Sequence, residues 1–147
     1  MRLHITALSC ILMFLAFGQE RQERVPQERV PTTVEQTCAP LGVVRTRTTL
    51  YFGLSKPGGA VTESEWHSFL QHEVTPRFPE GLTVWQADGQ WREANGKIGH
   101  ERAKVLLLVH EQSPELRPAI AGIIAAYKRS FAQESVLWET APVCAAF

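Results

Sequence analysis

Three polar side chains near the tip of a predicted β-hairpin have the types needed to bind a charged ligand. Gln90 and Arg92 lie in its first strand and Glu101 in its second, and the expected pairing places all three on one face. Glu134, near the end of a later helix, is expected at the same end of the sheet. The cations of Arg92 and Arg102 would hold the Glu101 carboxylate ionised, which suits a binding group better than a general acid. A solvated salt-bridge cluster is the alternative interpretation.

Other charged and aromatic residues extend this set. His100, expected opposite Trp91, has the residue type for acid-base work near neutral pH, although exposed cross-strand packing is the simpler interpretation. Arg77 could grip an anion, or tie the end of a helix to a carboxylate. The candidate ligand-binding residues are therefore Gln90, Trp91, Arg92, Glu101, Lys104 and Arg77.

The sequence predicts neither a metal site nor a cofactor. His67 and His72 are five residues apart in a predicted helix, so they do not share a face. No His or Cys lies at ligand spacing near Cys38 or Cys144. The sequence also lacks a Ser-His-Asp order, a phosphate-binding glycine loop and a carboxylate pair with defined spacing.

The hairpin that must position the candidates covers residues 81–110, two apolar stretches joined by Asn95-Gly96. This dipeptide tolerates the positive φ angles of a two-residue type I′ loop, which predicts that Gln90 faces Glu101. One face would carry Leu82, Val84, Val105, Leu107 and Val109, and the other Trp85, Trp91, His100, Lys104, Leu106 and Leu108. We expect this second face to be free of helices, and its apolar patch exceeds what a soluble monomer usually exposes.

Four more elements flank the hairpin. Residues 43–54 alternate apolar and polar side chains, which indicates a strand. Thr62 and Glu65 form a capping box at the start of a helix that ends before Pro76. Ser113-Pro114 predicts the N-cap and first position of a second helix, and residues 136–140 a last strand.

The resulting order βαββαβ predicts an α+β fold of the ferredoxin-like kind, a four-stranded antiparallel sheet with two helices on one face. We expect one domain over residues 38–147. Its first and last strands are neighbours in this topology, which brings Cys38 close to Cys144. An oxidising compartment would let them form a disulfide; two free thiols are the alternative.

The amino-terminal segment has the pattern of an export signal. Residues 1–18 combine Arg2, an apolar run and small residues at Ala16 and Gly18, so we expect cleavage before Gln19 and a secreted or periplasmic protein. The run is short for a membrane span. Cys10 leaves open a lipoprotein anchor.

Residues 19–37 contain Gln-Glu-Arg-Val-Pro twice and no apolar set to bury, which predicts a disordered tether. The whole chain of 147 residues has a formal charge of zero. This neutrality provides no electrostatic basis for binding nucleic acid.

Five segments together resemble an uncharacterised bacterial family, domain of unknown function 3574. They are residues 47–55 (RTTLYFGLS), 75–84 (TPRFPEGLTV), 89–92 (GQWR), 101–106 (ERAKVL) and 133–137 (QESVL). The resemblance covers about residues 38–147 and implies an exported bacterial protein. It implies no activity, so no catalytic residue is transferred. Ala103 stands where the family has Ser, which weakens any proposal of a nucleophile there.

Two functions of different class remain. The first is a noncatalytic module that binds a partner, a small anionic ligand or a second copy of itself through the helix-free sheet face. The second is a small cofactor-free enzyme with a pocket around Glu101, Arg92 and His100. We favour the first.

Overall fold

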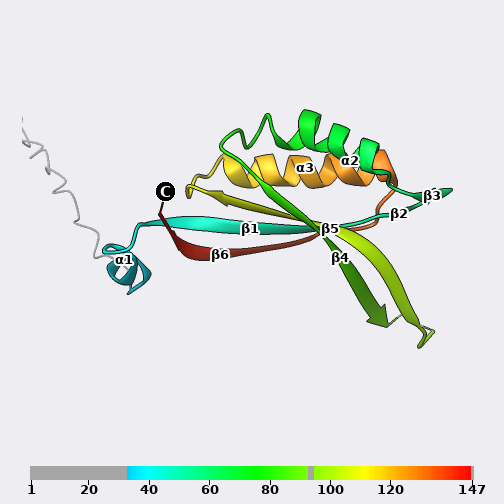
Figure 1. The fold of residues 1–147 in the computed structure, drawn as a ribbon, viewed down its shortest axis with the longest axis horizontal. Coiled ribbons are helices and arrows are strands. Elements are labelled where there is room, and N and C mark those ends of the chain that lie inside the picture. The colour runs from blue at the N-terminus through cyan, green and yellow to red at the C-terminus, as the bar shows by residue number, and fades with distance from the viewer. Residues whose placement is uncertain (1–32, 93–94, 147) are drawn as a thin grey trace, which may run out of the picture. The chain divides into compact units, whose positions relative to one another are not determined.

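A computed structural model describes residues 33–92 and 95–146 (Figure 1). The elements are α1 (Thr33–Cys38), β1 (Val43–Gly53), β2 (Ser55–Lys56), β3 (Gly59–Ala60), α2 (Glu63–Phe69), the π-helix η1 (Leu70–Val74), β4 (Thr83–Arg92), β5 (Ile98–His110), α3 (Leu116–Phe131) and β6 (Leu137–Ala145). The expected signal peptide, Cys10 and the repeats of the tether lie outside the described residues. In the described part, no helix is long and apolar enough to cross a membrane.

The fold is α+β, with one four-stranded antiparallel sheet in the order β4-β5-β1-β6. Helices α2 and α3 lie over one face of this sheet, and the β4–β5 hairpin extends beyond them (Figure 1). The small β2–β3 ladder lies between β1 and α2, where the sequence predicts no element. The central strands β5 and β1 therefore have one face under helices and one face without them.

The hydrophobic core fills the space between the sheet and the helices. Phe52 of β1 lies at its centre, with ring centroids 5.3 Å from Trp66 of α2 and 4.6 Å from Tyr127 of α3. Other fully or nearly fully buried members are Leu50, Phe69, Val74, Leu106, Leu108, Ile120, Ile123 and Ala126. These aromatic contacts fix α2 and α3 against the same strand.

The predicted register of the hairpin is wrong by one residue. Gln90 pairs with His100 and Gly89 with Glu101, and the ladder ends at Arg92 opposite Ile98. The connection is therefore longer than the expected two residues, although Gly96 has a positive φ of 85°. Because side chains alternate along a strand, a shift of one residue changes which side chains share a face.

The two tryptophans lie on the helix-free face as predicted, but their expected companions do not. Leu106 and Leu108 are in the core beneath the helices, and Lys104 contacts α2. On the helix-free face, Trp85 instead lies opposite Val105. Val105 is only 1% exposed there, because Trp85 and Tyr51 flank it from the neighbouring strands.

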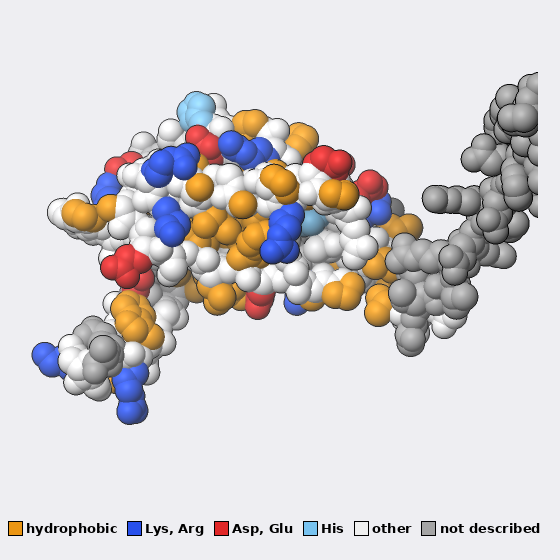
Figure 2. Space-filling view, turned by 180° about the vertical axis from the view of Figure 1, so that it is seen from behind, with side chains coloured by type: hydrophobic (Ala, Val, Ile, Leu, Met, Phe, Trp, Pro, Cys, Tyr) orange, Lys and Arg blue, Asp and Glu red, His pale blue; other side chains and the backbone are white. Residues whose placement is uncertain are grey.

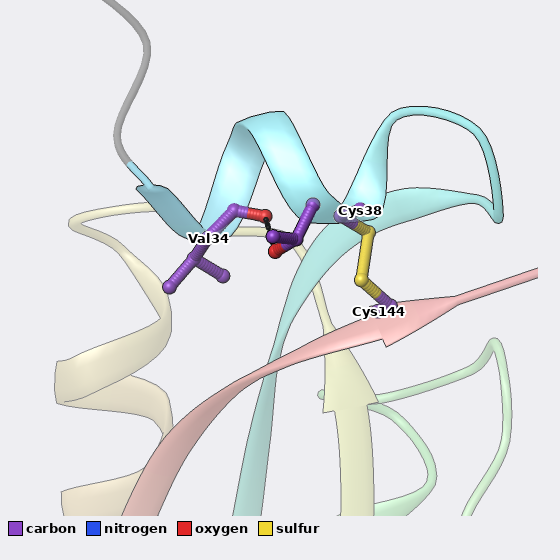
Figure 3. The surroundings of a disulfide bond; sticks show 4 residues. Val34, Cys38 and Cys144 are labelled. Carbon is purple, nitrogen blue, oxygen red and sulfur yellow. Dashed lines mark hydrogen bonds between the residues drawn. A yellow bond between two sulfur atoms is a disulfide. The ribbon is translucent and has the colours of Figure 1, made fainter.

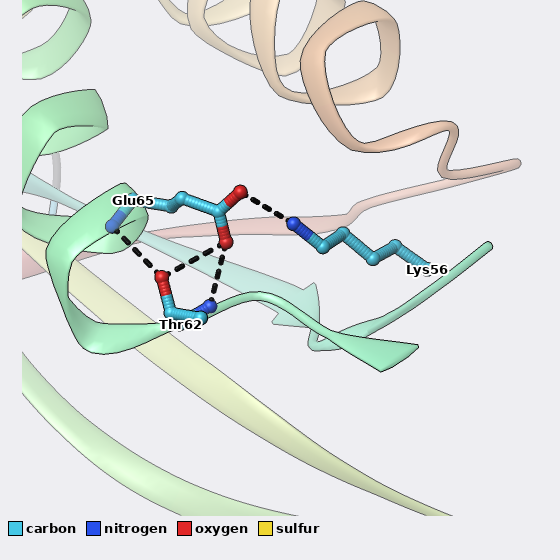
Figure 4. A network of polar contacts seen from close by, with 3 residues as sticks. All are labelled: Lys56, Thr62 and Glu65. Atoms are coloured by element: carbon cyan, nitrogen blue, oxygen red, sulfur yellow. Dashed lines mark hydrogen bonds and ion pairs between the residues drawn. The ribbon is translucent and has the colours of Figure 1, made fainter. Parts of the chain in front are cut away.

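The capping box at the start of α2 is confirmed. Glu65 N donates to Thr62 Oγ1 at 3.2 Å, and Thr62 N donates to Glu65 Oε2 at 2.9 Å. Lys56 of β2 also contacts the Glu65 carboxylate, which joins the β2–β3 ladder to the helix (Figure 4). The last turn before Thr75 is the π-helix η1.

Two predicted boundaries move. Helix α3 starts at Leu116 rather than Pro114, because Ser113 and Leu116 close a separate turn through a 3.2 Å backbone bond. Strand β6 continues past Thr140 to Ala145, pairing with β1 across Pro142. An edge strand tolerates proline because the missing N–H can face solvent.

The predicted disulfide between Cys38 and Cys144 is present (Figure 3). It links the end of α1 to β6, and the Cα atoms of the two cysteines are 5.4 Å apart. Within the sheet, Cys144 pairs with Val44 of β1. Cys38 is 1% exposed. Helix α1 occupies residues that the sequence assigns to the end of the tether.

Candidate functional site

The expected cluster of Gln90, Arg92 and Glu101 does not form on one face. In the observed register, Glu101 lies opposite Gly89 on the helix-free face, whereas Gln90 and Arg92 alternate to the other face. His100 is next to Glu101 in the strand, so it also points the other way. A single pocket around Glu101, Arg92 and His100 is therefore contradicted.

The Glu101 carboxylate is held against the end of β1. Its Oε1 accepts a 2.7 Å hydrogen bond from Ser55 N. A Cβ atom at Gly53 would lie 2.6 Å from Glu101 Oε2, so only glycine leaves room for the carboxylate in this position. The Gly53–Ser55 backbone therefore provides both the space and the donor that orient Glu101.

That backbone is fixed from the side of the helices. Tyr127 Oη of α3 donates to Gly53 O at 2.8 Å, and Leu54 N donates to Arg102 O at 2.9 Å. Gln133, just after α3, donates to Ser55 O. Burial, followed by the carboxylates of Glu101 and Glu65, raises the pKa of the Tyr127 phenol, which keeps it a hydrogen-bond donor.

A pocket of about 680 Å³ opens beside Glu101, and we call it the sheet-face pocket. Its residues come from β1, β2, β4, β5, the connection between α3 and β6, and the first residue of β6. They are Tyr51, Gly53, Ser55, Gly89, Trp91, Glu101, Ala103, Ala132, Gln133, Glu134, Ser135 and Leu137. This volume is in the range of small-molecule sites.

The sheet-face pocket is acidic and partly aromatic. Glu101 and Glu134 are its charged residues, so Glu134 lies at the same end of the sheet as Glu101, and neither has an ion-pair partner among the described residues. Trp91 and Leu137 are 48% and 63% exposed. Two carboxylates beside aromatic and apolar surface are suited to an organic cation.

Ala132 is the one described non-glycine residue with a positive φ, and it lines this pocket. Its φ of 54° ends α3 in the left-handed conformation, where an alanine is strained. The turn directs residues 133–135 into the pocket wall.

Lys104 and Arg77 have structural partners elsewhere. Lys104 is 8% exposed, and its Nζ lies 2.7 Å from Glu63 Oε1 of α2. This hydrogen bond lowers the pKa of the Glu63 carboxyl. Arg77 pairs with Glu73 at 3.0 Å and donates to its carbonyl. Arg77 thus ties down the end of η1, which was the alternative interpretation for this residue.

The sequence did not single out Tyr51, Tyr127 or Gln133 as parts of the site. A signal was present, because the segment 47–55 and the segment 133–137 both stood out as motifs. Only the fold brings these two segments into contact beside Glu101. Among the described residues, no group of His, Cys, Asp and Glu could hold a metal ion.

Comparison with known families gives a match over residues 47–147. The chain belongs to the family of proteins of unknown function DUF3574. This DUF3574 member includes all five motifs within or at the edge of the matched region. None of the curated proteins compared with it matches its sequence.

Two solved structures resemble the DUF3574 chain in fold. A phage SAM lyase in complex with S-methyl-5′-thioadenosine has a TM-score of 0.53 and 13% identity, covering 69% of this chain and 90% of its own. A phage SAM lyase in its apo state has a TM-score of 0.51 and 12% identity, covering 73% and 94%. At these identities the similarity establishes the fold alone.

Proposed function

We propose that the protein is an exported, noncatalytic module that binds a small organic cation in the sheet-face pocket. The observation that carries this proposal is the presence of two carboxylates in one pocket, Glu101 and Glu134, that lack a cationic partner among the described residues. A cation placed between them would gain Coulomb attraction and contact with Trp91.

The register of the β4–β5 hairpin determines whether the pocket suits a cation or an anion. The sequence favoured an anion because Arg92 was expected beside Glu101. With Arg92 on the other face, the described residues that line the pocket contribute negative charge and no positive charge. An anion would be repelled at this site.

Binding fits the pocket better than catalysis. Ser55 N donates to one carboxylate oxygen of Glu101, which fixes this group in the wall of the pocket. Glu134 and Tyr51 also line the pocket and are residue types that can transfer protons, so an assay for conversion of the bound ligand tests catalysis directly.

We further infer a ferredoxin-like βαββαβ arrangement and an exported location. The sheet order and the two helices on one face support the arrangement. The disulfide supports an oxidising compartment outside the cytosol. A signal peptide ending near Gly18, followed by a tether, remains the prediction for the amino-terminal segment, and lipid attachment at Cys10 is its alternative.

The fold neighbours suggest two probes that share a nucleoside. SAM carries a sulfonium cation, whereas S-methyl-5′-thioadenosine is an uncharged thioether with the same nucleoside. Choline provides an unrelated quaternary ammonium cation. We expect calorimetric titration of the full chain to detect SAM or choline and to show at least tenfold weaker binding of the thioether.

Variants of the pocket separate binding from general charge effects. Glu101→Gln and Glu134→Gln should each weaken cation binding about tenfold. Asp88→Asn removes a charge from the same hairpin on its other face and should have little effect. Equal binding of cation and thioether, or equal effects of the three variants, would contradict the proposal. Conversion of SAM into products that requires Glu101 would establish the enzymatic alternative instead.

Exposed apolar residues favour self-association as a second candidate function. Trp85, Leu137 and Val43 are 44%, 63% and 50% exposed, and their register places all three on the helix-free face. A second copy of the domain could cover this surface by packing sheet against sheet.

A further inference from the structure

A second cavity lies at the other end of α3, on the helix side of the sheet. It has a volume of about 520 Å³ and opens between the start of α3 and the edge strand β6. We call it the edge cavity and define it by Thr48, His110, Pro114, Arg117, Ile120 and Trp138. Its lining shares no residue with the sheet-face pocket.

The indole nitrogen of Trp138 is the first feature of this cavity that points to a ligand. Trp138 pairs with Leu50 in the sheet, so its ring faces the helical layer. Its Nε1 is buried and has no hydrogen-bond partner among the described residues. An indole N–H can only donate, so it needs an acceptor at this position.

Arg117 places a positive charge over the same ring. Its Cζ lies 5.4 Å from the Trp138 ring centroid. The nearby carboxylates are otherwise engaged, because Glu111 pairs with Arg45 at 3.2 Å and Glu115 accepts from Ser113. Arg117 has no ion-pair partner among the described residues. The cavity thus combines a buried donor with an unneutralised guanidinium.

His110 lies in the wall and has a protein partner at each ring nitrogen. Its Nδ1 lies 2.7 Å from Glu111 O, which can only accept, so Nδ1 carries a proton. In the uncharged ring Nε2 is then the acceptor for the Thr48 hydroxyl, at 2.9 Å. Both ring nitrogens are therefore engaged, and neither is available to a ligand.

We propose that the edge cavity binds a small organic monoanion, a carboxylate with an apolar tail. One guanidinium balances one negative charge, and its planar donors match the two oxygens of a carboxylate. A carboxylate oxygen also supplies the acceptor that Trp138 Nε1 lacks. Pro114, Leu116 and Ile120 offer apolar surface for the tail. Figure 2, the view from behind, shows a group of exposed hydrophobic side chains with basic side chains on either side. A histidine lies beside one of these basic side chains.

The test uses three six-carbon probes that differ only in the head group: hexanoate, hexanol and hexylamine. The protein has four tryptophans, so a proton–nitrogen correlation spectrum contains four indole signals, and Trp138→Phe identifies the one from Trp138. We expect hexanoate to shift this signal downfield, as a new hydrogen bond requires. Hexanol and hexylamine should bind at least tenfold more weakly.

Variants decide whether Arg117 supplies the charge. Arg117→Gln should weaken hexanoate binding at least tenfold, while Arg129→Gln, a basic residue in the last turn of the same helix, should not change it. Glu101→Gln should also leave hexanoate binding unchanged, which separates this site from the sheet-face pocket. The proposal is overturned if hexanoate binds no better than hexanol, if the Trp138 indole signal stays in place, or if the two arginine variants behave alike.

Discussion

Gly53 and Glu101 come from different strands and depend on each other: a Cβ on Gly53 would lie 2.6 Å from the Glu101 carboxylate. The carboxylate occupies space that any other residue at position 53 would fill. This contact places the acidic group at the wall of the sheet-face pocket. It explains in physical terms why a glycine interrupts the apolar and aromatic segment of β1.

The first prediction changes this contact. Gly53→Ala should displace the Glu101 side chain and weaken cation binding about tenfold. Its effect on the free energy of unfolding should be about 1 kcal/mol, at the low end for overpacking, because the displaced group is the end of a flexible side chain. Calorimetric titration and urea unfolding measure the two effects.

Gly122→Ala is the matched control for this change. Gly122 lies within α3, and a Cβ there would find its nearest neighbour, Arg77 Nε, at 3.8 Å. Alanine should therefore stabilise the helix by about 0.5–1 kcal/mol and leave binding unchanged. A normal affinity in Gly53→Ala would show that Glu101 has no fixed role in the pocket.

The second prediction concerns acid stability. Hydrogen bonds from Lys56 and then from Thr62 lower the pKa of the Glu65 carboxyl to about 2 (Figure 4). Because the folded-state pKa is below the ordinary value of 4.5, Glu65 stabilises the protein above pH 4.5, and this contribution is lost as pH falls toward 2.

Thermal unfolding of Glu65→Gln tests the second prediction. Its Tm should be below that of the unchanged protein at pH 6, and the gap should close between pH 4.5 and pH 2. Glu80→Gln, which alters an exposed loop carboxylate, serves as the control. A gap that stays constant over this range would mean that the charge of Glu65 contributes nothing.

The third prediction concerns the disulfide (Figure 3). Cys38 and Cys144 are 106 residues apart, so the bond closes a loop that contains nearly the whole sheet. In the chain-entropy model, replacing both with serine should lower the free energy of unfolding by about 4 kcal/mol. Urea unfolding with and without reductant provides the measurement. If reductant affects the serine variant as strongly as the unchanged protein, the bond is not the cause.

The fourth prediction tests self-association. Trp85→Asp should shift the protein from dimer to monomer without unfolding it, because Trp85 is 44% exposed and faces away from the core. Ile98→Asp is the control, since Ile98 is 47% exposed but alternates to the other face of the hairpin. Native mass spectrometry reports the oligomeric state. A monomer in the unchanged protein, or equal effects of the two variants, would remove this candidate.

Local sequence patterns were sufficient for several features of this protein. The Thr62 and Glu65 capping box depends on residues three apart, so its geometry follows from the start of a helix alone. The strand order followed from the succession of elements, and it brought Cys38 to Cys144. Trp85 and Trp91 share a face because their spacing of six is even, whatever the pairing.

The candidate site depended on a relationship that no local pattern determines. Turn chemistry at Asn95-Gly96 indicated a register, but β5 also pairs with β1 and buries Leu106 and Leu108 under the helices. These packing contacts select the register one residue away. A slip of one residue moves every side chain to the opposite face relative to the partner strand. Glu101 therefore lies on the other face from Arg92, next to Gly53 and Ser55 and in the pocket that Glu134 also lines. The sequence thus determined which strands and helices form, whereas the packing of the whole sheet decided which charges meet.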